Sequence, residues 1–237
     1  MNRTVILILF FATFVTSNPI SREHIKLNCS QEHPYDVSTK SEAITVFKIH
    51  YSKIPKLNLT NICLAFPNLY RIYIRDSAVE EITPDSFNAC VNAILIDLLS
   101  NKIKQLDVNL FKNNEKLAWL DFENNQLKQI PNQIFNNLKK LFVLILSNNK
   151  LINLDDELID SINENCPEIR SIYWRGNKFK CERLEEIKMK YKELRFLRDI
   201  DRPWDCVKTD YESDEYESIE FDELEELFES IKFDKSK

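Results

Sequence analysis

Apolar residues recur along this chain at spacings that fit neither a helix nor a single alternating strand. In LAWLDFENNQLKQI, residues 117–130, the apolar positions Leu117, Leu120, Phe122, Leu127 and Ile130 are separated by 3, 2, 5 and 3 residues. A helix stripe would repeat every three to four residues, and a strand would repeat every second residue. Only residues 119–123 alternate, and they predict a short strand that leads into a turn.

The same layout returns at a nearly constant interval. It is found at residues 44–57, 69–82, 93–106 and 141–154, and a sixth copy begins at residue 169. Each copy has a polar residue after its short strand, at separations of 25, 24, 24, 24 and 28 residues: Ser52, Ser77, Asn101, Asn125, Asn149 and Asn177. A side-chain amide at this turn can hydrogen-bond backbone groups of the adjacent coil. A period of this length indicates a solenoid of stacked coils.

The spacing L-x-x-L-x-L-x-x-N-x-L is that of the leucine-rich repeat. We therefore predict an α/β leucine-rich repeat solenoid with six short parallel strands on its concave face and a cap at each end. The inward leucines stack between coils, because no single coil can bury its own apolar face. We expect Phe87, Phe111 and Phe135 to fill the core behind the sheet. The predicted organisation is a signal peptide (1–17), an N-terminal cap (18–43), repeats (44–177), a C-terminal cysteine cap (178–207) and an acidic tail (208–237).

The first 17 residues, MNRTVILILFFATFVTS, place one arginine before an apolar run that ends in small residues. This is the pattern of a secretory signal peptide. The run is too short for a membrane anchor, and no other long apolar run follows, so we expect a secreted, extracellular protein with no membrane insertion. Two glycosylation sequons then become relevant, at Asn28 and Asn58.

The six cysteines also favour an oxidising compartment. Cys63 and Cys90 fall on adjacent coils, so a Cys63–Cys90 disulfide is predicted. Cys90 and Cys166 occupy equivalent positions three coils apart, roughly 14 Å, which is beyond disulfide reach. The pairing of Cys29 and Cys166 stays open: Cys166 is most simply a buried free thiol, and Cys29 competes with Cys90 for Cys63.

Two stretches carry a family resemblance. NICLAFPNLYRIYIRDSAVEEITPDSFNAC, residues 61–90, resembles the first repeats of insect secreted leucine-rich repeat proteins. NKFKC followed by RPWDC resembles the C-terminal cysteine cap of extracellular leucine-rich repeat proteins. The second resemblance implies a Cys181–Cys206 bridge, with a helix between the two cysteines formed around Leu184, Ile187, Tyr191 and Leu194. The first implies an extracellular binding protein, in a setting of innate immunity or cell-surface recognition.

Catalytic chemistry has little support in the sequence. The chain has one glycine, Gly176, so glycine loops for phosphate are absent. Its three histidines, His24, His33 and His50, show no metal-ligand spacing. Asp97 and Asp121 occupy matching positions on adjacent strands, but such a pair more often belongs to a partner-binding surface than to acid–base catalysis. We expect no enzyme activity, no cofactor, no metal and no nucleic-acid partner.

Strand alternation identifies the residues on the open face of the sheet, the face that points away from the core. We expect an exposed apolar cluster with a polar rim there, a combination that usually marks an interface. The predicted partner-binding residues are Arg71, Tyr73, Leu95, Asp97, Leu99, Trp119, Asp121, Val143, Ile145 and Tyr173. The expected partner is an extracellular protein or glycan. A homodimer through this face is an alternative, and in a third interpretation Trp119 only covers its sheet neighbours.

The last thirty residues differ in composition from the rest. They contain twelve Asp/Glu and four Lys, a net charge of −8, while the whole chain has a net charge of −6. Tyr211 and Tyr216 lie among acids and are candidate sulfation sites. Residues 208–218 are typical of a solubilising disordered segment. Residues 221–231 have apolar residues at helical spacing and predict a short amphipathic helix that docks on a basic surface or a partner.

These patterns favour a secreted, non-enzymatic recognition or adaptor protein that uses the concave face of its solenoid. A structural extracellular-matrix or adhesion component is the alternative.

Overall fold

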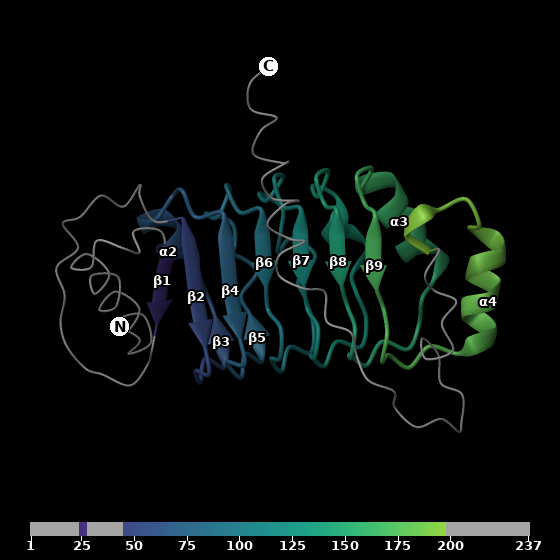
Figure 1. Cartoon of the computed structure of the whole chain (residues 1–237), viewed down its shortest axis with the longest axis horizontal. Coiled ribbons are helices and arrows are strands. Elements are labelled where there is room, and N and C mark those ends of the chain that lie inside the picture. The colour runs from purple at the N-terminus through teal and green to yellow at the C-terminus, as the bar shows by residue number, and fades with distance from the viewer. Residues whose placement is uncertain (1–23, 28–44, 198–237) are drawn as a thin grey trace, which may run out of the picture. The chain divides into compact units, whose positions relative to one another are not determined.

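The structure is a computed structural model that describes residues 24–27 and 45–197. Its main element is a seven-stranded parallel sheet in the order β1-β2-β4-β6-β7-β8-β9 (Figure 1). The strands are β1 (His24–Leu27), β2 (Val46–His50), β4 (Arg71–Arg75), β6 (Leu95–Asp97), β7 (Trp119–Asp121), β8 (Val143–Ile145) and β9 (Ser171–Tyr173). The six predicted strands are all present, and the α/β leucine-rich repeat solenoid is confirmed.

The sheet has one strand more than the six predicted. β1 lies inside residues 18–43, the predicted N-terminal cap, and pairs with β2 so that His24 is opposite Val46. The separation of these partners is shorter than the repeat period. β1 was therefore not recognisable from the repeat period.

A ladder of buried asparagines joins each coil to the one before it. Asn125 shows the pattern: its Oδ1 accepts from the Ile103 N–H at 3.0 Å, and its Nδ2 donates to the Leu98 carbonyl at 2.9 Å and to the Phe122 carbonyl at 3.1 Å. Asn101, Asn149 and Asn177 repeat these bonds with their own neighbours. The ladder satisfies backbone groups that have no strand partner. Ser77 donates its hydroxyl to the Arg75 carbonyl, which lies two residues earlier in its own coil.

The residue before each polar turn position adopts a left-handed backbone conformation. The φ angles there lie between 50° and 71°, at Tyr51, Asp76, Ser100, Asn124, Asn148 and Gly176. The only glycine of the chain occupies this position in the last coil. A Cβ on Gly176 would clash with the Asn148 Oδ1, so no side chain fits there without displacing Asn148.

The core lies on one side of the sheet and continues through all the coils. Ile96, Leu120 and Leu144 are aligned across β6, β7 and β8, and each is at most 1% exposed. Behind them Phe87 and Phe111 stack with ring centroids 5.5 Å apart, and Phe135 is equally buried. The predicted place of these phenylalanines in the core is confirmed. Because each coil buries its neighbours' side chains, the described repeats stabilise one another.

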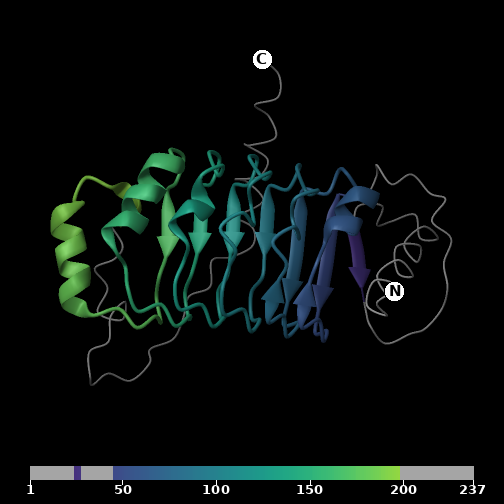
Figure 2. The ribbon, with the colours of Figure 1, turned by 180° about the vertical axis from the view of Figure 1, so that it is seen from behind.

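Short elements of varied type form the other side of most of the described coils, as Figure 2 shows from behind. These are β3 (Lys56–Leu57), which pairs with β5 (Glu81–Ile82), α2 (Thr60–Ala65), the 3-10 helix η3 (Asn132–Phe135) and α3 (Asp156–Asn165). α3 accounts for the longer fifth interval. Its N-cap, Asp155, accepts from the Leu158 N–H at 2.9 Å.

The C-terminal cap begins with a helix, as predicted. α4 (Cys181–Lys190) buries Leu184 and Ile187, but it ends before Tyr191 and Leu194, and the 3-10 helix η4 (Arg195–Leu197) follows. The helix is therefore shorter than the apolar spacing indicated. Lys190 and Arg183 on this helix both bind the Asp156 carboxylate of α3, at 2.8 and 2.9 Å, which ties the cap to the last coil.

The cysteines differ in their roles. Cys63 and Cys90 form a disulfide between adjacent coils, with their Cα atoms 4.9 Å apart. Cys181 is also disulfide-bonded, to a cysteine outside the described residues, so its pairing with Cys206 stays a prediction. Cys166 is a buried free thiol, and burial raises its pKa to about 12. A thiol with this pKa is almost entirely protonated at neutral pH and does not act as a nucleophile.

Candidate binding surface

Two rows of side chains cross the open face of the sheet. Strand register places Leu95, Trp119 and Val143 side by side, and it places Asp97, Asp121 and Ile145 side by side two residues further along the strands. Register also extends the first row to Arg71 and Ser171, and the second row to Tyr73 and Tyr173. The predicted residues on these five strands therefore come together. Their side chains belong to no part of the core cluster behind the sheet.

The expectation that this cluster is exposed is wrong. Trp119 is 6% exposed, and Leu95 and Val143 are 2% and 5% exposed. Other members of the two rows are buried to a similar degree: Tyr73, Asp97, Asp121 and Ile145. The remaining predicted residues are half-buried: Arg71, Leu99 and Tyr173. Neighbouring strands lie only about 4.8 Å apart, so large side chains in register cover one another's flanks. Strand alternation predicts the direction of a side chain but not this lateral cover.

The acidic residues Asp97, Asp121 and Glu123 occupy the middle of the face. Arg75 donates from its guanidinium to the Asp97 Oδ2, at 2.8 Å from Nε. The other Asp97 oxygen accepts from the Leu99 N–H at 3.0 Å, and Asp121 accepts in the same way from the Glu123 N–H at 2.7 Å. Burial, and then the charge of Asp97, raises the pKa of Asp121 well above its ordinary value. Ionisation of Asp121 beside the charged Asp97 is therefore unfavourable.

The N-terminal end of the face is basic and aromatic. The Lys48 ammonium lies 5.0 Å from the centre of the Tyr73 ring, and the Arg75 guanidinium lies 5.4 Å from it. Burial raises the pKa of Tyr73 to about 12, so this phenol stays protonated. Burial and Arg75 lower the pKa of His50, which is neutral at pH 7. Lys48, Arg75 and Glu123 were not among the predicted binding residues, although their strand positions place them on this face.

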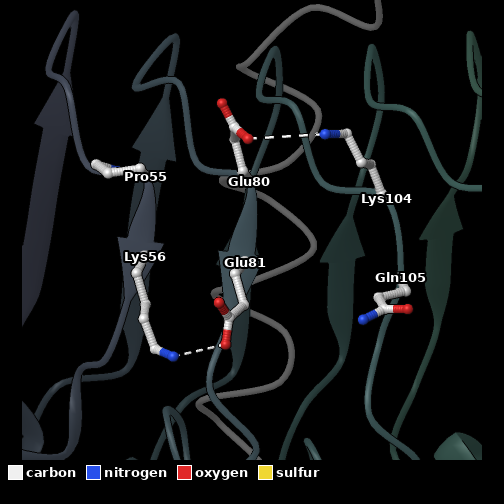
Figure 3. A pocket seen from close by; sticks show the side chains of 6 residues that line it. All are labelled: Pro55, Lys56, Glu80, Glu81, Lys104 and Gln105. Carbon is white, nitrogen blue, oxygen red and sulfur yellow. Dashed lines mark hydrogen bonds and ion pairs between the residues drawn. The ribbon is translucent and has the colours of Figure 1, made fainter.

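A pocket on another part of the coils has different chemistry (Figure 3). It is lined by Pro55, Lys56, Glu80, Glu81, Lys104 and Gln105. Lys56 binds Glu81 at 2.7 Å, and Lys104 lies 3.7 Å from Glu80, so each charge in the pocket has an opposite charge beside it. The lining has no nucleophile and no histidine. We assign no ligand to this pocket.

Within residues 24–27 and 45–197, no group of three His, Cys, Asp or Glu side chains could hold a metal ion. No helix in this part of the chain is long and apolar enough to cross a membrane. Asn58 of the second sequon is exposed, and its Oδ1 accepts from the Thr60 N–H at 2.9 Å. Several predicted features lie outside the described residues: the signal peptide, Asn28, Cys29, Cys206, Tyr211 and Tyr216.

Comparisons with known proteins agree with the coil geometry. The leucine rich repeat family matches residues 67–127 and 95–151. An internalin from Listeria monocytogenes is similar in structure, with 19% sequence identity and a TM-score of 0.47, over 61% of this chain and 38% of that chain. A chain of the LRIM1/APL1C complex has 23% identity and a TM-score of 0.52, over 65% of this chain and 28% of that chain. No curated protein shows significant similarity to the sequence.

The described coils are therefore those of a leucine-rich repeat solenoid, and the family match lies within residues 67–151. Leucine-rich repeats generally act through protein–protein interaction, and the repeats suggest that role here. The matched region spans 38% and 28% of the two solved structures. At 23% identity the likeness to the LRIM1/APL1C chain concerns the fold alone.

Proposed function

We propose that the protein is a secreted, non-enzymatic recognition protein that binds an extracellular protein through the open face of its sheet. The observation that carries this proposal is the aligned row of Leu95, Trp119 and Val143 on the side away from the core. These apolar side chains are not part of the core cluster behind the sheet. We infer that they contact another protein surface, because tryptophan and tyrosine are favoured anchors of such contacts.

Secretion is supported by the N-terminal signal pattern, the glycosylation sequons and the even number of cysteines. The resemblance of residues 61–90 to insect secreted leucine-rich repeat proteins supports a role in innate immunity. Tyr211 and Tyr216, if sulfated, would add negative charge to a tail that is already acidic.

The test compares three full-length proteins as baits for the native extracellular fluid: the wild type, Trp119→Ala and Leu64→Ala. Leu64 is a matched control, because it is a large apolar residue on α2 with an exposed fraction of 67%. We expect a soluble protein that wild type and Leu64→Ala retain and that Trp119→Ala binds about thirtyfold more weakly, as for a central aromatic anchor worth ~2 kcal/mol.

The retained protein, once identified by mass spectrometry, is titrated against each variant to obtain the dissociation constant. Equal affinity of all three proteins would show that the binding site does not lie on the open face. Retention of glycans or matrix fibres alone would favour the structural or adhesive role.

A further inference from the structure

The turn that follows the repeat layout is held by a side-chain oxygen in several coils. It begins at the residue after each copy of the layout, a position occupied by Asn58, Asp107 and Asp155 in three of the coils. Asp107 accepts from the Asn109 N–H at 2.8 Å, and Asp155 accepts from a backbone N–H of α3 at 2.9 Å. Asn58 accepts from the Thr60 N–H at 2.9 Å through Oδ1. The turn therefore requires an acceptor, which a carboxylate supplies as well as an amide does.

The amide nitrogen of Asn58 has no role in this turn. Within the described residues it donates to no other atom, and the side chain is exposed. Other asparagines on the outside of the coils do use this nitrogen. Nδ2 of Asn92, Asn113 and Asn137 each donates to a carbonyl of the preceding coil, at 2.9, 3.1 and 2.8 Å. The described coils therefore account for the oxygen of Asn58 but not for its nitrogen.

We propose that Asn58 carries an N-linked oligosaccharide. Asn58-Leu-Thr is the only glycosylation sequon within the described residues. The proposal rests on the proposed function in one respect, because only a secreted chain meets the lipid-linked donor of the sugar. In the transfer, Nδ2 forms a bond to the anomeric carbon of a lipid-linked oligosaccharide and gives up one proton. The bond from that carbon to the lipid diphosphate breaks, and the diphosphate leaves with its electrons. Oδ1 still accepts from the Thr60 N–H, so the sugar leaves the turn intact.

The oligosaccharide extends from the side of the coils opposite to the open face. Asn58 lies between β3 and α2, and both elements belong to that opposite side (Figure 2). Its neighbours along the chain, Leu57 and Leu59, are buried in the core, whereas Asn58 is exposed between them. The sugar therefore leaves the open face accessible to a partner.

The test expresses the full chain in cultured eukaryotic cells and uses the protein that they secrete. Peptide N-glycosidase in ¹⁸O-labelled water removes an N-linked oligosaccharide and leaves a labelled aspartate in place of the asparagine, which peptide mass spectrometry locates. We expect this label at residue 58 of wild type. Asn58→Asp should migrate faster than wild type in denaturing gel electrophoresis before the treatment, and together with wild type after it. This variant keeps its fold, because aspartate supplies the same acceptor at the equivalent turn of Asp107.

Asp107→Asn is the matched control. It places an amide at the equivalent turn but creates no sequon, because residue 109 is an asparagine. Label at residue 107 of this variant measures spontaneous deamidation, and it should be far weaker than the label at residue 58. Equal label at the two residues, or equal migration of untreated wild type and Asn58→Asp, would overturn the proposal. If a partner still requires Trp119 in that case, the proposed binding function stands. If Asn58 carries the sugar but no partner requires Trp119, only the proposed binding function fails.

Discussion

The asparagine ladder makes a sharp prediction for Asn125, in the middle of the solenoid. Asn125→Ala removes the only hydrogen-bond acceptor of the Ile103 N–H within the described residues. The three carbonyls that share the Asn125 amide group are less affected, because each keeps another donor: Asn101 for Leu98, Asn149 for Phe122 and the Ser100 N–H for Glu123. One buried donor is therefore left without a partner, and the three acceptors together lose the two N–H groups of one amide.

The cost of this change follows from the lost donor partner and the two lost N–H groups. An unsatisfied buried group costs about 1–3 kcal/mol, and each lost N–H donor costs about 0.5–1.5 kcal/mol. We expect Asn125→Ala to lower the free energy of unfolding by about 2–6 kcal/mol, measured by urea denaturation at 25 °C. Lys128→Ala is the control in the same coil, because its exposed side chain should change stability by no more than about 0.5 kcal/mol.

Asn125→Asp separates the hydrogen-bond explanation from a simple packing effect, because it preserves the shape of the side chain. The aspartate still accepts from the Ile103 N–H, but it presents a second acceptor to the carbonyls of Leu98 and Phe122. Burial raises the pKa of such a carboxyl, so the variant loses stability as the pH rises through its unfolded-state pKa and beyond. Its deficit relative to wild type should be smaller at pH 4 than at pH 7. A deficit independent of pH, or an alanine variant as stable as Lys128→Ala, would refute the reasoning.

Two further predictions concern neighbouring residues of β7. Leu120→Ala should lower the free energy of unfolding by about 2–5 kcal/mol, because Leu120 is 1% exposed within the core; an unchanged urea midpoint would show that the strand register is wrong. Asp121→Asn should raise stability at pH 7, because burial and Asp97 raise the pKa of Asp121, and wild type therefore loses stability as the pH rises from the unfolded-state pKa to the folded-state pKa. The difference should disappear below about pH 3, where the carboxyl is mostly neutral in both states, and a difference that is constant with pH would contradict the assignment.

The repeat pattern predicted most of the fold because it contains two periods, one within each strand and one from coil to coil. The two-residue period of each strand separates Trp119 from Leu120, and the nearly constant coil length places equivalent residues opposite each other. The rows of the open face could therefore be written from sequence positions alone. β1 could not be found in this way, because its distance along the sequence from β2 is shorter than the repeat period.

The contacts within the face were less accessible to sequence reasoning. Arg75 binds Asp97 although the two residues occupy different rows, because a long side chain reaches the diagonal neighbour on the adjacent strand. Residues grouped by equivalent strand positions fall into separate rows, so this grouping does not predict a contact between Arg75 and Asp97. The burial of Trp119 was missed for a related reason: alternation states which face a side chain points to, and exposure depends on how the side chains of adjacent strands cover one another.

Asp121 gives an independent reason to regard the open face as functional. Its carboxyl is buried beside Asp97, and the resulting rise in its pKa means that ionisation costs stability at neutral pH. Its bond to the Glu123 N–H does not require a charge, since an asparagine could accept the same hydrogen. The coils therefore gain nothing from the negative charge at this position. A residue that lowers the stability of its own fold is expected where binding requires it. A cationic group on the bound surface would supply a positive charge beside Asp121 and so favour its ionised form.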